Sequence, residues 1–176
     1  MTDLQYLYSE FEKEIVIVET TIQDVDIVNS DFSTAQITIA NSSIKNLTIR
    51  QTNENLEHLE EELESLDTLY ENGFNGEISL KNMREVSLEF KDIPVPGNII
   101  INNSPNAVLT FSGTTEITGN ITIQYSPNVI LKILDKVKVT GTITYEHSSI
   151  TTHIRSTTDI SRAQIKNIGS RVSTLF

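Results

Sequence analysis

The sequence predicts an all-β fold, a right-handed parallel β-helix of about six coils, on three observations. Ile, Val and Thr make up 56 of the 176 residues while Ala occurs four times, a composition typical of strands. Short apolar-polar-apolar triplets recur about every 22 residues. A small residue stands two positions before six of the seven triplets. Self-similarity at such a period indicates one structural unit stacked repeatedly on itself.

The first triplet of each repeat defines the period. Successive triplets start 22, 41, 21, 22, 22 and 22 residues apart. Gly97, Gly119 and Gly141 precede three of them, each followed by one polar residue, and are expected at one tight corner of each coil. The triplets occupy residues 15–17, 37–39, 78–80, 99–101, 121–123 and 143–145, with a weaker one beginning at Ile165.

A second triplet and a third apolar site complete each repeat. The second triplets lie at 25–27, 47–49, 86–88, 109–111 and 131–133, and the turns between the two strands are written TTI, NSSI, NSPN, YSPN or HSSI. The third site is Val95, Ile117 and Val139. Three short strands per 22 residues favour a three-faced parallel β-helix whose coils stack about 4.8 Å apart. A β-sandwich or barrel is the alternative.

The 41-residue spacing predicts an insertion of 19 residues within the second coil. Residues 52–73 contain a stripe of Leu and Tyr residues at helical spacing, together with eight acidic residues and no Lys or Arg. This pattern predicts an acidic α-helix. The stripe either covers an apolar face of the same chain or forms a coiled coil with a partner protein. Its members, our candidate partner interface, are Leu56, Leu59, Leu63, Leu66 and Tyr70.

The two ends of the solenoid differ. Leu4, Leu7, Tyr8 and Phe11 follow helical spacing, so residues 1–13 are expected to form a capping helix before the first coils at 14–51. The remaining coils span 74–176, and the last one loses the pattern. His153 falls where an apolar residue is expected, unless a slip of one residue brings Ile154 inside. Stacking on another subunit is expected at this end.

The repeats resemble known β-helices. Residues 117–150 read ITGNITIQYSPNVILKILDKVKVTGTITYEHSSI. This cadence resembles the repeats of receptor L domains and related fungal cell-wall glycoproteins, which implies a role in recognition or wall organisation. The wider pattern over 14–165 is similar to the solenoids of phage tail spikes and pectate-lyase-like proteins. No binding residue of these families is matched position by position.

The sequence contains no recognisable catalytic or metal-binding pattern. There is no cysteine, which excludes disulfides, thiolate metal sites and a Cys nucleophile. His58, His147 and His153 lack metal-ligand spacing, and Asp24 and Asp26 are followed one coil later by Asn46 and Thr48 instead of further carboxylates. We therefore expect no enzyme activity, no cofactor and no bound metal.

One outward row of the first strands is a candidate binding surface, with a glycan as the candidate ligand. Flat rows of Thr and Ser can bind ordered surfaces, although Thr is also a common exposed strand residue. Val16, Ile100 and Lys166 interrupt the row. Its candidate residues are Thr38, Ser79, Thr122 and Thr144.

Charge and hydropathy narrow the expected partners. The formal net charge of -11 argues against nucleic acid, because binding to phosphates needs Lys and Arg gathered on one face. No apolar run is long enough to insert into a membrane, and no signal peptide is visible, which favours a cytoplasmic or virion-associated location.

We expect a non-catalytic binding or structural module, with a protein partner or self-association, serving as a recognition or assembly protein of a virion or cell surface. One alternative is a scaffold that polymerises end to end, as bactofilin-like β-helices do. The other is a carbohydrate-active β-helix enzyme.

Overall fold

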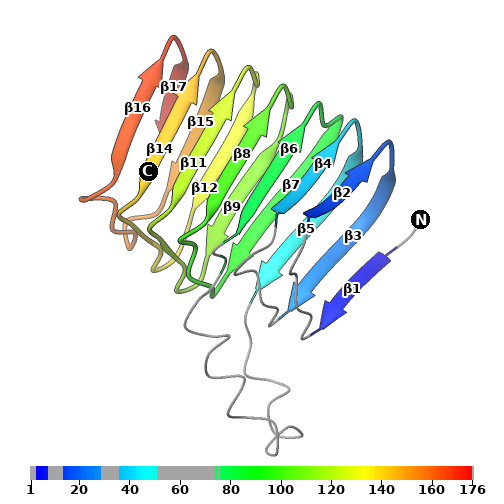
Figure 1. Ribbon diagram of the computed structural model, residues 1–176. Helices are drawn as coiled ribbons and strands as arrows, with labels where there is room; N and C mark the ends of the chain where they lie inside the picture. The colour runs from blue at the N-terminus through cyan, green and yellow to red at the C-terminus, as the bar shows by residue number, and fades with distance from the viewer. Residues whose placement is uncertain (1–2, 8–13, 29–35, 51–73, 75, 176) are drawn as a thin grey trace, which may run out of the picture.

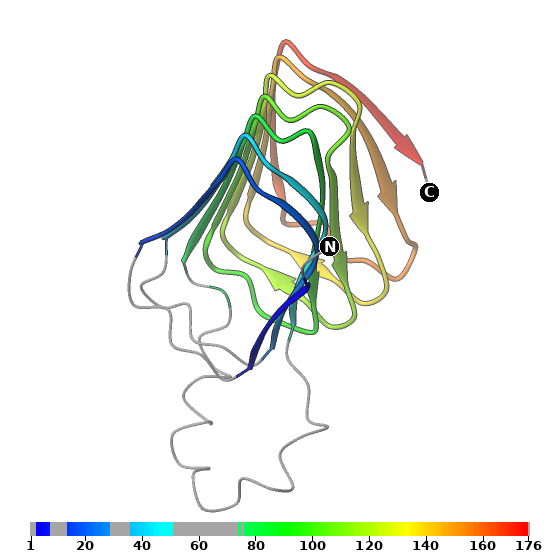
Figure 2. The same ribbon diagram turned by 90° about the vertical axis from the view of Figure 1, so that its right-hand side faces the viewer.

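A computed structural model of the chain describes residues 3–7, 14–28, 36–50, 74 and 76–175. In these residues the protein is an all-β parallel solenoid of about six coils, consistent with the expected right-handed β-helix. Figure 1 shows the coils stacked in one row, with β1 at one end and β16 and β17 at the other. Figure 2 shows the same stack turned by 90°, with the chain winding around a common interior.

Strands that follow one another in the chain alternate between two large parallel sheets. In order, the eight-stranded sheet contains β1 (Asp3–Leu7), β3 (Thr21–Val28), β5 (Ser43–Arg50), β7 (Glu85–Lys91), β9 (Val108–Ser112), β12 (Val129–Ile133), β15 (Ser149–Ile154) and β17 (Arg171–Leu175). The seven-stranded sheet contains β2 (Glu14–Val18), β4 (Gln36–Ala40), β6 (Glu77–Lys81), β8 (Asn98–Asn102), β11 (Asn120–Gln124), β14 (Thr142–Glu146) and β16 (Gln164–Ile168).

A short third face closes the coil, as the third apolar site predicted. It consists of β10 (Glu116–Ile117) and β13 (Lys138–Val139). Val95, one coil before β10, extends this face through a parallel bridge to Ile117.

The core consists of columns of identical or similar side chains. In the seven-stranded sheet Ile99, Ile121 and Ile143 pair in register, each at most 2% exposed. In the eight-stranded sheet Phe90 pairs with Phe111, and both are fully buried. Because alternate strand residues point to opposite faces, this register directs one apolar set inward in every coil.

The glycine corner is explained by the closeness of successive coils. A Cβ at Gly119 would lie 1.9 Å from the carbonyl oxygen of Gly97, and one at Gly141 would lie 2.0 Å from that of Gly119. Real Cβ atoms never approach backbone so closely, so this corner excludes a side chain in these coils.

The Asn-Ser turns form two hydrogen-bonded ladders. Asn41, Asn82 and Asn103 have φ near 50°, which Asn tolerates, and the Nδ2 atoms of Asn82 and Asn103 donate to the Oδ1 of the Asn one coil earlier. The next position of the turn holds a buried Ser in several coils, among them Ser104 and Ser126. Ser126 Oγ accepts from Ser104 N at 3.0 Å and donates to Gln124 O at 2.8 Å. Each buried Ser therefore links two coils and satisfies its own hydroxyl.

The expected capping helix is wrong for the residues that the structure describes. Asp3–Leu7 is strand β1, which pairs in parallel with β3 through Asp3↔Asp24 to Leu7↔Val28. The sequence DLQYL also alternates polar and apolar residues, and the open edge of β3 offers backbone partners that an isolated short helix lacks.

Other expectations fall outside the described residues. These are the rest of the capping segment, at 1–2 and 8–13, and the whole of the predicted inserted helix at 52–73, including Leu56, Leu59, Leu63, Leu66 and Tyr70. Within the described ranges, no helix has the length and apolar character needed to cross a membrane.

Candidate functional site

The C-terminal end of the solenoid exposes side chains whose equivalents are buried in the coils immediately before it. Ile143 is 2% exposed, whereas Ile165, its partner in the next coil, is 57% exposed. Ile150 is 3% exposed, whereas its partner Val172 is 37% exposed. In these two columns the apolar residues and the strand register continue into the last coil. The exposure therefore arises because no described element lies beyond that coil.

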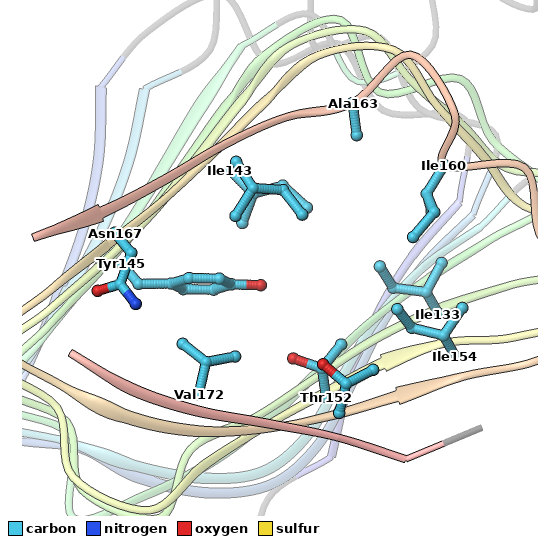
Figure 3. A pocket seen from close by; sticks show the side chains of 11 residues that line it. Ile133, Ile143, Tyr145, Thr152, Ile154, Ile160, Ala163, Asn167 and Val172 are labelled. Carbon is cyan, nitrogen blue, oxygen red and sulfur yellow. The ribbon is translucent and has the colours of Figure 1, made fainter.

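A cavity of about 290 Å³ lies inside the last coils. Strands β12, β14, β15, β16 and β17 contribute to its wall, together with the corner at Ile160 and Ala163. Figure 3 shows the ring of Tyr145 reaching into the space, with Val172 on one side of the ring and Ile143 on the other. The cavity is a continuation of the apolar interior into the end of the stack.

Two inward columns become polar at this end. The column containing Ile123 continues as Tyr145 and Asn167, and the column containing Leu131 continues as Thr152 and Thr174. Our sequence analysis assigned no role to these residues, although their departure from Ile and Leu at fixed repeat positions is a readable signal. The register pairs Ile154 with Ile133 and His153 with Lys132. The slip of one residue that brings Ile154 inside is therefore confirmed.

The Thr152 hydroxyl is a buried polar group in this interior. Thr152 is 3% exposed, and its Oγ1 has no hydrogen bond of ordinary geometry to any residue that the structure describes. The hydroxyl lies close enough to the Tyr145 phenol to lower the phenol pKa, but burial is the larger effect and raises the pKa of Tyr145 above its usual value near 10. The protonated phenol is thus the form that the folded interior favours.

We expect this burial to make the fold sensitive to alkali. The phenol of the unfolded chain loses its proton near pH 10, and the folded one at higher pH. Its contribution to stability is therefore complete below about pH 10 and is lost as the pH rises through the folded pKa. Urea unfolding at about pH 8 and about pH 11 should show a smaller loss of stability for Tyr145→Phe than for the wild type. Equal losses of stability in the wild type and in Tyr145→Phe would show that burial of the Tyr145 phenol is not the cause of the alkaline sensitivity.

The end carries exposed positive charge. Lys166 lies on β16 and Arg171 on β17, and Arg155 and Arg162 lie in the loops of the same coil; all four are exposed. Asp159 lies in the same coil, and its pKa is lowered mainly by the Ser161 hydroxyl and backbone N–H, which donate to its Oδ1 at 2.7 and 3.0 Å, with smaller effects of Arg162 and Lys138.

The predicted binding row lies in one column of the seven-stranded sheet. Thr38 pairs with Ser79, and Thr122 pairs with Thr144, with Ile100 between the two pairs. Ser79 is only 4% exposed, so it contributes little accessible surface, and its buried Oγ has no hydrogen bond within the described part of the chain. Glycan binding by the Thr residues stays a prediction.

The other polar groups are dispersed. Asn46 donates its Nδ2 to Asp24 Oδ1 in the neighbouring coil, and Tyr125 stacks on His147 at 5.5 Å in the turn. In the part of the chain that the structure describes, no three His, Asp or Glu side chains gather as a metal site.

Comparisons of this chain with protein-family models, with curated protein sequences and with solved structures find no match. The fold therefore rests on the strand register, and the choice of site rests on the exposed end of the stack.

Proposed function

We propose that the protein is a non-catalytic structural module that associates with copies of itself through the C-terminal end of its solenoid. The observation that carries the proposal is the change from 2% to 57% exposure between Ile143 and Ile165 in one column. Burying a fully exposed Ile or Val side chain contributes roughly 1.5–3 kcal/mol, so covering Ile165, which is 57% exposed, would contribute about half of that.

The backbone of this end supports the same proposal. Strands β16 and β17 are the last strands of the two large sheets, and among the described strands each pairs on one side only. An unpaired strand edge presents N–H and C=O groups that another strand can bind. Of the functions expected from the sequence, end-to-end assembly is the one to which such an end is suited.

Light scattering after size-exclusion chromatography tests the proposal over a wide range of protein concentrations. The wild type should show a mass that rises with concentration. The double variant Ile165→Asp and Val172→Asp should remain a monomer, because a joint would bury its carboxylates without partners. Circular dichroism and the urea midpoint report whether the variant is folded.

Two further variants keep the test decisive. Leu175→Asp changes a side chain that is 52% exposed on the same end and does not line the cavity, so it should weaken association without loss of folding. Tyr125→Ser removes a 51% exposed side chain from the middle of the stack and should leave association unchanged. A monomeric wild type, or association that survives both end variants, would refute the proposed function.

A further inference from the structure

The two ends of the chain carry opposite charge. Residues 1–35 contain eight acidic residues and one basic residue, Lys13, whereas residues 153–176 contain four basic residues and one acidic residue, Asp159. The net charge of -11 does not reveal this separation, because most of that charge comes from the acidic segment at 54–71.

The edge strands of the described fold show the same division. At the N-terminal end, Asp3 is the only charged residue of β1 and Glu14 the only one of β2. At the C-terminal end, Lys166 is the only charged residue of β16 and Arg171 the only one of β17, each two residues along the strand from the position equivalent to Glu14 or Asp3. Both basic side chains are exposed, and neither has an ion pair with an acidic side chain among the described residues.

Strand direction and charge together decide which surfaces fit. All strand pairs of the two large sheets are parallel, so the C-terminal end of one copy placed on the N-terminal end of another continues the existing pairing. Joining two C-terminal ends would instead pair strands antiparallel and place Lys166 and Arg171 against basic residues. Like charges brought together across an interface oppose binding.

We infer that the C-terminal end of one copy binds the N-terminal end of the next, in a head-to-tail arrangement. This inference rests on the proposed function and names its partner surface. Strand β1 of the second copy pairs with β17 as β1 pairs with β3 within the chain. A joint of two different surfaces does not close on itself, so assembly continues in one direction as an open chain.

Charge reversal at each end tests the inference by light scattering and sedimentation. The C-terminal variant carries Lys166→Glu and Arg171→Glu, and the N-terminal variant carries Asp3→Lys and Glu14→Lys. Each alone should weaken self-association about tenfold or more, and combining all four changes in one chain should restore it. Added salt should weaken the wild-type joint, because exposed charges are screened.

A matched control alters charge away from the ends. Lys81→Glu and Lys136→Glu change exposed residues in the middle of the solenoid by the same total charge as the C-terminal variant, and should leave association unchanged. Urea midpoints verify that every variant is folded.

The outcomes separate this inference from the proposed function. A discrete dimer that the N-terminal variant does not weaken would indicate C-terminal ends joined to each other, which overturns the head-to-tail inference and leaves the proposed function intact. Failure of the four-change chain to associate, when each pair of changes alone abolishes association, also overturns the inference. A wild type that stays monomeric removes the proposed function itself.

Discussion

Replacing Gly119 with Ala is expected to destabilise the solenoid by about 3 kcal/mol or more. The new Cβ would lie 1.9 Å from Gly97 O and 2.4 Å from Pro96 O, and both atoms belong to backbone that cannot rotate away. Relief requires the two coils to separate, which strains the hydrogen bonds from Gly119 N to Val95 O and from Thr142 N to Gly119 O. The loss is a large part of the 5–15 kcal/mol that typically stabilises a domain.

Urea unfolding of Gly119→Ala and of Thr118→Ala measures this effect. Thr118 is exposed at the same corner, so its truncation should change the free energy of unfolding by no more than about 0.5 kcal/mol. Gly141→Ala should repeat the large loss, since its Cβ would lie 2.0 Å from Gly119 O. If Gly119→Ala unfolds at the same urea concentration as Thr118→Ala, the coils do not approach each other at this corner as described.

The same corner explains why so much of the fold could be predicted from sequence. A glycine, one polar residue and an inward triplet recur at fixed spacing, and each must meet its equivalent in the next coil for the backbone to pack. Triplets 99–101, 121–123 and 143–145 accordingly lie in β8, β11 and β14 in perfect register. The minor apolar site at Ile117 and Val139 likewise predicted the third face.

The N-terminal segment shows where local patterning fails. Leu4 and Leu7 suit a helix, while the alternation in DLQYL suits a strand, and five residues are too few to decide by period. The strand conformation of this segment is decided by its pairing with the open edge of β3, which lies later in the chain. The burial of Ser126 behind its turn has a similar origin, because its partner Ser104 N belongs to another coil.

The exposure of the candidate site could not be predicted from residue types. Ile143 and Ile165 are the same amino acid at the same repeat position, yet one is buried and the other is 57% exposed. Exposure here depends on what lies next in the stack, which a repeat pattern does not encode. The change of two columns to Tyr145 and Thr152 is the part of the site that the sequence does contain.

Truncation of Phe90 is expected to cost about 3–5 kcal/mol, the other large effect in this fold. Phe90 is fully buried between two other aromatic rings. Its ring centroid lies 5.2 Å from that of Phe74 and 5.5 Å from that of Phe111, and the planes of Phe90 and Phe111 are stacked at 12°. Phe90→Ala removes the middle ring and leaves a cavity that the paired strands β5, β7 and β9 cannot close without losing register. Phe90→Leu fills most of that space and should cost much less.

Tyr125 provides the comparison that separates burial from ring contact. Its ring lies 5.5 Å from that of His147 at 20°, nearly the geometry of Phe90 on Phe111, but Tyr125 is 51% exposed. Tyr125→Ala should therefore cost about 0.5 kcal/mol or less, because little apolar surface returns to water and no internal cavity forms. Equal losses for Tyr125→Ala and Phe90→Ala in urea unfolding would mean that ring stacking, and not the closed aromatic interior of the middle coils, stabilises this solenoid.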